Sequence, residues 1–435
     1  MSRSSLGVAL LDADGAESGW ACLYPDQPFR FRTTSDLSSR HIWWTDVEPV
    51  EFTSRGYNRI PRLRSAEFLG VSMSRICLEI GVSPQVRSHQ SHLLSRLAAT
   101  VSAWGRSLGI NGVPRHSYVR AFRRALVGRR RGFRSTEPML EAVGSTWTTW
   151  TDVCNPPSSS EKVVLQLRRH RATHALEILD YPSPALGARW AYLDRATVAG
   201  KNVSEIDLNR PTLLLCKVEG AREEGAGKLF PEFTAAGTGS SVFMRRYAPG
   251  LAWASVPVAR FMAERFRISV VDAIQADASG QPLFEVRQCP GEAMASYAFG
   301  ILLHARYASF LFRDDSKRDI TPTAAWICGL DRVFLLRQYE LLRQSTQNVE
   351  LVGYGMGALH VAIDRRDADQ VMSSLHRTDL HPNLPDAPFS TSPISSDASG
   401  RDIQRALIFR GQSRSLLALD QYLVEAHREA PDALA

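Results

Sequence analysis

The sequence predicts an α+β fold that is rich in helix, with an N-terminal sheet or hairpin region and a larger helical C-terminal half. Two observations predict it. Residues 7–24 show a strand, a glycine-containing turn and a second strand, a pattern typical of a β-hairpin. In the C-terminal half, 294–312 is almost continuously apolar, and Thr321 followed by Pro322 marks the start of a further helix with helical apolar spacing.

The elements between these two regions follow from local patterns. Alternation of apolar and polar residues, broken by prolines, indicates edge strands near 28–32 and 47–52. Ser83 and Pro84 open a helix in which Leu93, Leu97 and Val101 share one face. We expect further helices near 115–127, 136–150 and 256–266, and strands near 163–168, 174–179, 212–220, 267–271 and 282–288.

Length and composition set the domain organisation. The chain has 435 residues, of which 44% are hydrophobic and 22% charged, values typical of a globular protein with two or three domains. We expect an N-terminal domain over 1–152, a mixed core domain over 163–378, a Pro- and Ser-rich arm over 379–400 and a docking helix over 401–435.

Cysteine usage and the chain start favour an intracellular protein that is not secreted. The six cysteines lie far apart with no C-x-x-C pair, so we expect neither a metal site nor disulfides. The first apolar run is too short for a signal peptide. His304 and Arg306 interrupt the longest apolar run, which argues against a membrane span.

Glycines in the late segment 348–363 do not indicate a cofactor. Gly353, Gly355 and Gly357 have the spacing G-x-G-x-G, whereas a dinucleotide-binding fingerprint needs G-x-G-x-x-G. We therefore interpret this stretch as a turn from a strand to a helix and expect no cofactor.

Positive charge is concentrated in one segment. Between residues 80 and 136 there is no Asp or Glu, while eleven arginines accumulate. The whole chain has a formal net charge of +7, so subtracting +11 leaves about −4 for the rest. The basic character of the protein therefore belongs to this segment.

Guanidinium groups bind phosphate oxygens through two parallel hydrogen bonds, so this segment predicts contact with a nucleic-acid backbone, RNA or DNA. Gly128 and Gly132 flank an arginine triplet and suggest a mobile basic loop. A second, smaller basic spot lies near residue 170. The predicted phosphate contacts are Arg115, Arg120, Arg123, Arg124, Arg129, Arg130, Arg131 and Arg134, with Arg168, Arg169 and Arg171 from the second spot.

These features favour a non-enzymatic, nucleic-acid-binding structural subunit of a large nucleoprotein assembly. Such an assembly would be a viral or phage capsid or nucleocapsid, or an RNA-guided or organellar RNA complex, with other protein subunits as partners. No catalytic motif of high specificity occurs in the sequence. An alternative is a structural clamp whose basic segment binds acidic protein partners without nucleic acid.

A second alternative is enzymatic. Asp12, Asp180 and Asp272 each follow a strand-like apolar run. Carboxylates at neighbouring strand ends resemble those with which nuclease folds of the ribonuclease H type hold two metal ions. The resemblance implies a metal-dependent nuclease, if the three aspartates converge.

Overall fold

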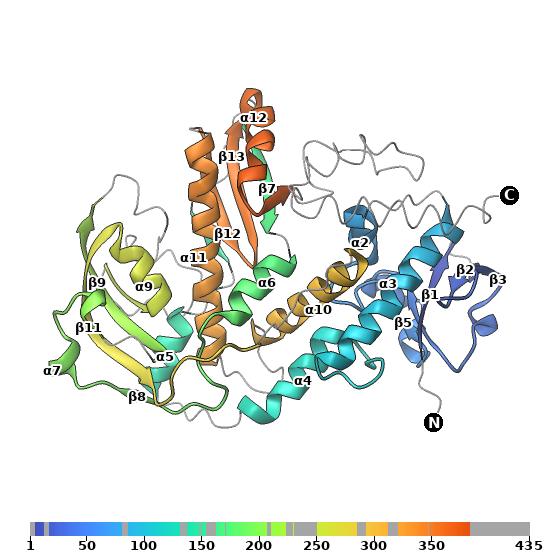
Figure 1. The fold of residues 1–435 in the computed structure, drawn as a ribbon, viewed down its shortest axis with the longest axis horizontal. Helices are drawn as coiled ribbons and strands as arrows, with labels where there is room; N and C mark the ends of the chain where they lie inside the picture. The colour runs from blue at the N-terminus through green and yellow to red at the C-terminus, as the bar shows by residue number, and fades with distance from the viewer. Residues whose placement is uncertain are drawn as a thin grey trace. The chain divides into compact units, whose positions relative to one another are not determined.

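The computed structural model describes residues 5–12, 17–80, 86–130, 137–146, 148, 150–153, 162–169, 171–206, 210–222, 229, 250–284, 293–311, 321–346 and 348–382. Within them the chain has the predicted mixed α+β fold, with three sheets (Figure 1). It forms two compact units. The first unit holds the described residues of Met1–Arg124 and Arg287–Ser309, and the second unit holds those of Ala125–Val286 and Phe310–Pro388.

The first unit is built on a mixed five-stranded sheet of order β3-β2-β1-β4-β5. β1 pairs antiparallel with β2 and parallel with β4; β2 pairs antiparallel with β3, and β4 parallel with β5. The predicted N-terminal hairpin is confirmed as β1 and β2. The strands are β1 (Leu6–Leu11), β2 (Gly19–Cys22), β3 (Phe29–Phe31), β4 (Ile42–Thr45) and β5 (Leu63–Arg64).

The two faces of this sheet are buried by different elements. Alternate residues such as Ala9, Phe31 and Trp43 pack into an apolar cluster with Phe52 and Tyr57. The opposite face, which carries the intervening residues, is covered by α3, which contacts β1 and β2. A sheet covered on both sides explains why β1 is buried throughout.

The helices of the first unit are α1 (Pro49–Ser54), α2 (Met73–Ile80), α3 (Arg87–Ser107), the first part of α4 (Tyr118–Arg130) and most of α10 (Ala293–Leu311), with η1 (Thr34–Asp36) and η2 (Tyr57–Arg59). α10 is the predicted apolar helix, and it packs on α3 through Trp104 and Phe299, whose ring centroids lie 4.9 Å apart. The strand predicted at 47–52 is wrong, because Pro49 stands at the first position of helix α1.

The described beginning of the mobile basic loop predicted at 128–134 is helical, and residues 131–134 lie outside the described part. α4 continues through Gly128 to Arg130, so one glycine, which costs a helix interior about 1 kcal/mol, does not end it. Phe122 and Leu126 are buried and Arg120 and Arg124 exposed, as the helical spacing predicts.

The second unit contains an antiparallel five-stranded sheet of order β14-β7-β13-β12-β6. Its strands are β6 (Thr151–Asp152), β7 (Lys162–Arg169), β12 (Glu350–Gly355), β13 (Ala358–Asp364) and β14 (Leu380–Pro382). β14 occupies the beginning of the predicted arm, and residues 383–435 lie outside the described part.

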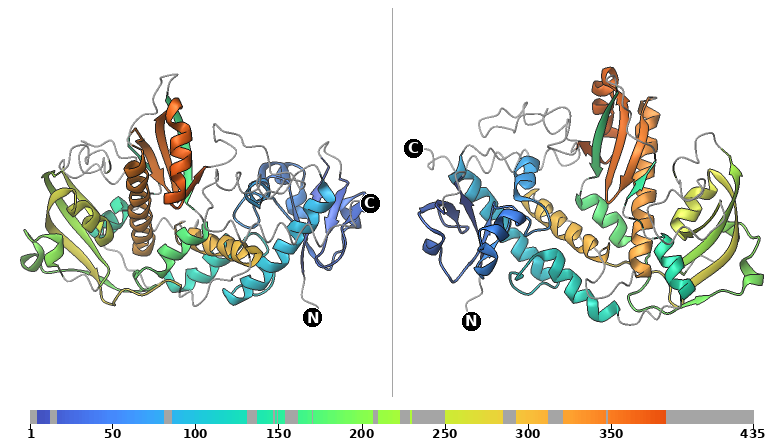
Figure 2. Two further views of the ribbon diagram at one scale, coloured as in Figure 1. Left: turned by 45° about the horizontal axis from the view of Figure 1, so that its top comes forward. Right: turned by 180° about the vertical axis from the view of Figure 1, so that it is seen from behind.

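Helices α5 (Glu137–Thr146), α6 (Arg171–Asp180), α11 (Pro322–Ser345) and α12 (Ala368–Ser374) belong to the same unit, with η6 (Arg365–Asp367) and η7 (Leu375–Arg377). Thr321 caps α11 as predicted, accepting a hydrogen bond from the Ala324 amide at 3.2 Å. Figure 2 shows α11 beside the strands β12 and β13, which it contacts. The strand predicted at 174–179 is wrong, since these residues lie in α6.

A second antiparallel sheet of this unit has the order β10-β9-β11-β8, and α9 packs on it (Figure 2). Its elements are β8 (Trp190–Tyr192), α7 (Arg195–Val198), η3 (Val203–Glu205), β9 (Thr212–Ala221), β10 (Leu251–Ser255), α9 (Val256–Ala263) and β11 (Phe266–Ala276). The described residues of the predicted strand 282–288 form none.

Cys22, Cys77, Cys216 and Cys328 are free and buried. None of the helices in the described ranges combines the length and the apolar character that crossing a bilayer requires.

The glycine-rich stretch near residue 355 forms a β-hairpin, so the predicted strand-to-helix turn is wrong. Gly355, Met356 and Gly357 all have positive φ, which suits a tight turn. The Gly357 amide donates to Asp331 Oδ1 at 2.9 Å, and His174 Nε2 lies 2.6 Å from the same oxygen. A Cβ at Gly357 would lie 3.0 Å from His174 Cε1.

Replacing Gly357 with Ala should therefore destabilise the second unit more than the same change at Gly200. Both glycines have φ near +75°, which costs an alanine about 1 to 2 kcal/mol. A Cβ at Gly200 meets nothing within 4 Å, so the clash should add roughly 1–3 kcal/mol at Gly357 alone. Urea unfolding measures both variants, and equal shifts in midpoint would contradict the packing.

Candidate functional site

Two carboxylates stand at the ends of adjacent parallel strands in the first unit. Asp12 follows β1 and Asp46 follows β4. Ala9 pairs with Thr45, so Asp46 continues beside Leu10. Side chains two residues apart on a strand share a face, so Asp12 lies on the face of Leu10 as well. Both carboxylates therefore belong to one end and one face of the sheet.

Asp46 is held by the end of β1 and the start of α3. Its Oδ1 accepts a hydrogen bond from the Leu11 amide at 2.9 Å, and its Oδ2 accepts one from Arg87 Nη1 at 2.8 Å. Arg87, the first residue of α3, also donates through Nη2 to the Leu11 carbonyl. The carboxylate is thus tied to the backbone next to Asp12, with its side chain 22% exposed.

Asp12 is bound by groups from β3 and from the residue before β2. Arg30 donates from Nη1 to Oδ1 at 3.1 Å and from Nη2 to Oδ2 at 2.6 Å, and the Ser18 hydroxyl donates to Oδ2 at 2.7 Å. The hydrogen bond from Ser18, and then Arg30, hold the pKa of Asp12 below its usual range. Asp12 is therefore ionised at neutral pH.

The other two aspartates of the predicted nuclease site lie in the second unit, and neither stands at the end of a strand. Asp180 is the last residue of helix α6, and Asp272 lies inside β11, which continues to Ala276. Both belong to the second unit. The partner that the sequence reasoning missed is Asp46. Its signal was the same as that of Asp12, an acid directly after the apolar strand Ile42–Thr45.

The first unit carries the described arginines of this segment up to Arg124, and the later ones belong to the second unit. Arg115, Arg120 and Arg124 are exposed, whereas Arg123 is half-buried. Arg129 and Arg130 lie in the last turn of α4. Arg131 and Arg134 lie outside the described residues. Phosphate contact by these arginines remains a prediction.

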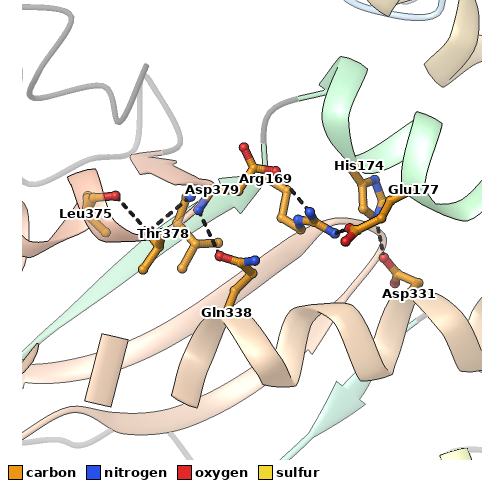
Figure 3. Close-up of polar contacts among 9 residues, drawn as sticks. Arg169, His174, Glu177, Asp331, Gln338, Leu375, Thr378 and Asp379 are labelled. Atoms are coloured by element: carbon orange, nitrogen blue, oxygen red, sulfur yellow. Dashed lines mark hydrogen bonds and ion pairs between the residues drawn. The ribbon is translucent and has the colours of Figure 1, made fainter. Parts of the chain in front are cut away.

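The second basic spot differs from the first in burial. The Arg169 side chain is 2% exposed; its Nη1 lies 2.6 Å from Glu177 Oε2, and its Nη2 donates to Asp379 Oδ2 at 3.0 Å (Figure 3). The Asp379 amide in turn donates to Gln338 at 2.8 Å. Arg168 and Arg171 are half-buried. Arg169 thus joins β7, α6 and the residue before β14 inside the protein, and we do not retain it as a phosphate contact.

Figure 3 also shows His174 of α6 facing Asp331 of α11. Both side chains are buried, and Asp331 additionally accepts the hydrogen bond of the Gly357 amide. This pair holds the β12–β13 turn against two helices. Because both side chains are buried, we assign the pair a structural role.

No family model matches the chain, and no curated protein matches it in sequence. Among solved structures, the chain is similar to Phi29 DNA polymerase complexed with primer-template DNA and incoming nucleotides. That match has 8% identity and a TM-score of 0.43, and it covers 83% of this chain and 80% of the other. The complex of the same polymerase with single-stranded DNA matches with 8% identity and a TM-score of 0.41, covering 82% and 80%. At such scores we transfer no residue role.

These matches correct the expectation of a non-enzymatic structural subunit of a capsid or nucleoprotein particle. The structures that the chain resembles over about four fifths of its length are complexes of an enzyme. Nothing in the described fold supports a shell protein, and we withdraw that interpretation.

Replacing Arg169 with Met should lower the free energy of unfolding of the second unit by roughly 2–3 kcal/mol. Two carboxylates lose their charged partner, and hydrogen bonds to charged groups contribute about 1.5–3 kcal/mol each. Arg366 is a matched control, because it pairs with Asp364 while its side chain is 81% exposed. An Arg366→Met variant should change stability by less than about 1 kcal/mol. Equal unfolding midpoints for the two variants would refute the structural role of Arg169.

Proposed function

We propose that the protein acts on nucleic acid as a metal-dependent nuclease, with its reaction site at Asp12 and Asp46. The observation that carries this proposal is the placement of two carboxylates at the ends of adjacent parallel strands, on one face of the sheet. Carboxylates at neighbouring strand ends resemble those with which nuclease folds of the ribonuclease H type hold metal ions, and the parallel pairing of β1 with β4 places Asp12 and Asp46 in this way. That likeness is an analogy of fold and supports the proposal without assigning it.

The donor set suits one hard divalent cation. Mg²⁺ in phosphate-processing sites is held by one or two carboxylates together with water and substrate phosphate oxygens. Asp12 and Asp46 would supply the carboxylate oxygens, and the Leu11 carbonyl, which Arg87 contacts, offers a third oxygen. When bound there, the ion supplies neutralisation of the phosphoryl oxygens. The described residues contain no cluster of three or more His, Cys, Asp or Glu side chains, so substrate oxygens would complete the shell.

In the free protein, Arg30 forms an ion pair with Asp12 and Arg87 forms one with Asp46. The Arg30 side chain is 50% exposed and that of Arg87 28%. An exposed ion pair such as that of Arg30 with Asp12 contributes at most about 1 kcal/mol, so a divalent ion and a phosphate can displace Arg30 at little cost. The pair of Arg87 with Asp46 is partly buried and is harder to open. A guanidinium released from a carboxylate in this way has its donors free to hold the phosphate oxygens.

In this arrangement the protein groups have separate tasks. Ser18 fixes the orientation of the Asp12 carboxylate and keeps it ionised. The Leu11 amide fixes Asp46 against the end of β1. Arg30 and Arg87 orient the phosphate and stabilise the negative charge that develops on its oxygens.

Asp12→Asn and Asp46→Asn should each lower the rate of strand cleavage roughly 100-fold or more, because each removes one of the two negative charges that would hold the divalent cation. The assay uses end-labelled single- and double-stranded DNA and RNA with Mg²⁺ or Mn²⁺, and EDTA as the blank. Asp26→Asn is the matched control, since this exposed aspartate in the same unit contacts its neighbours through main-chain atoms.

Circular dichroism establishes that the variants fold. Absence of cleavage by the unmodified protein on every substrate and with both metals would overturn the proposal. So would a rate for Asp12→Asn equal to that of Asp26→Asn.

A further inference from the structure

Four basic side chains gather where α3 gives way to α4. Arg115 and His116 lie in the connection between the two helices, and Arg120 and Arg124 lie on α4. Residues four apart on a helix are neighbours on its surface, so the last two arginines share one side. All four side chains are exposed. We call these four residues the α4 patch.

The described charges around the α4 patch are positive. Partial loss of hydration, followed by the positive charges of Arg124, Arg120, Arg115 and Arg64, lowers the pKa of His116. Within the described ranges, neither Arg115, Arg120 nor Arg124 pairs with a carboxylate. Like charges held together repel one another, and an anion relieves that repulsion.

A buried arginine fixes the backbone of the α4 patch. Arg64, at the end of β5, is 7% exposed. Its guanidinium donates to the carbonyls of Pro61 at 2.6 Å, Leu63 at 2.7 Å and Pro114 at 3.2 Å. The last of these bonds anchors the residue directly before Arg115. The patch is thus preorganised, which lowers the entropy cost of binding a ligand.

We propose that the α4 patch binds successive phosphates of a polynucleotide strand. Guanidinium forks match phosphate oxygens in pairs, and a polynucleotide presents such groups in a continuous series. Protonated His116 would add one more donor to the bound anion.

Helix α3 runs from the carboxylates at its first residue to the connection with the α4 patch at its last. Its first residue, Arg87, contacts Asp46, and its last residue, Ser107, leads to the connection with Arg115. Its 21 residues span about 31 Å at 1.5 Å per residue. A strand with a rise of 3.4 Å per nucleotide needs about nine nucleotides to cover that length. This part of the inference rests on the proposed nuclease function.

The first experiment measures binding in EDTA, so that its result does not depend on cleavage. A labelled 20-nucleotide oligothymidylate is titrated over a salt series with the unmodified chain and with the triple variant R115A/R120A/R124A. Three lost phosphate contacts should lower the slope of log K against log salt by about 2 for a single strand. Affinity at low salt should fall at least tenfold.

The matched control is R32A/R40A/R59A, which removes the same charge from exposed positions of the same unit. An equal loss in the control would show that net charge alone matters and would overturn the site. A triple variant that binds normally would do the same. Poly-L-glutamate serves as the second ligand, and a larger loss for it than for the oligonucleotide would indicate an acidic protein partner instead.

Two further measurements sharpen the test. Lowering the pH from 7.5 to 5.5 should strengthen oligonucleotide binding by the unmodified chain, because bound phosphates favour the protonated form of His116, whose pKa its arginine neighbours lower in the free protein. His116→Gln should abolish that gain. An unchanged gain in His116→Gln would remove His116 from the site. In the cleavage assay, the triple variant should slow reaction of 20-nucleotide substrates at limiting concentration but not of four-nucleotide substrates. An equal slowing of both lengths would contradict the 31 Å spacing.

Discussion

The parallel pairing of β1 with β4 is the constraint on which the candidate site depends. Parallel neighbours end at the same edge of a sheet, so acids that follow both strands are brought together by register alone. The Leu11 amide then takes Asp46 as its acceptor, which fixes that carboxylate beside the chain that continues to Asp12. A one-residue slip of β4 would send Asp46 to the other face, into the apolar cluster around Trp43.

Arginine serves two opposite purposes in this protein, and burial separates them. Arg64 and Arg169 are buried, and their guanidinium groups donate hydrogen bonds to carbonyls or carboxylates of the same unit. Arg115, Arg120 and Arg124 lie at the surface, and no carboxylate in the described part of the chain pairs with them. Because a buried guanidinium must be satisfied internally, its hydrogen-bond donors are not available to a ligand. Counting arginines along the sequence therefore overstates the number of guanidinium groups that can contact a phosphate.

Local patterns predicted the parts of the fold in which one signal dominates. The N-terminal hairpin, the Thr321 cap and the inner face of α4 follow from turn, capping and helical spacing. The same reasoning failed where two signals compete. Residues 174–179 form a short, mostly apolar run that resembles a strand, yet His174, Ala175, Ile178 and Leu179 are buried at helical spacing in α6.

Half of the carboxylate site was predictable. Asp12 was found because it follows an apolar strand, and Asp46 meets the same rule. Asp180 and Asp272 meet it in the sequence but not in the structure, since one ends a helix and the other lies within a strand that has an irregular register at Val270. Which strand ends adjoin is a property of sheet order, and a single sequence carries no signal for it.

The first unit is discontinuous in the chain, which has a consequence for its synthesis. Residues up to Arg124 leave the ribosome well before Arg287, where the chain returns to supply α10. At 5–20 residues per second, the roughly 160 intervening residues take about 10 to 30 s. Throughout that time Trp104 has no ring contact with Phe299. Glu79 likewise lacks the hydrogen bond that it accepts from the Tyr297 hydroxyl at 2.6 Å in the folded protein. Until α10 is synthesised, the core formed by the sheet and α3 is incomplete and its apolar surface is exposed. This is therefore the stage at which a holdase chaperone would bind the nascent chain most strongly.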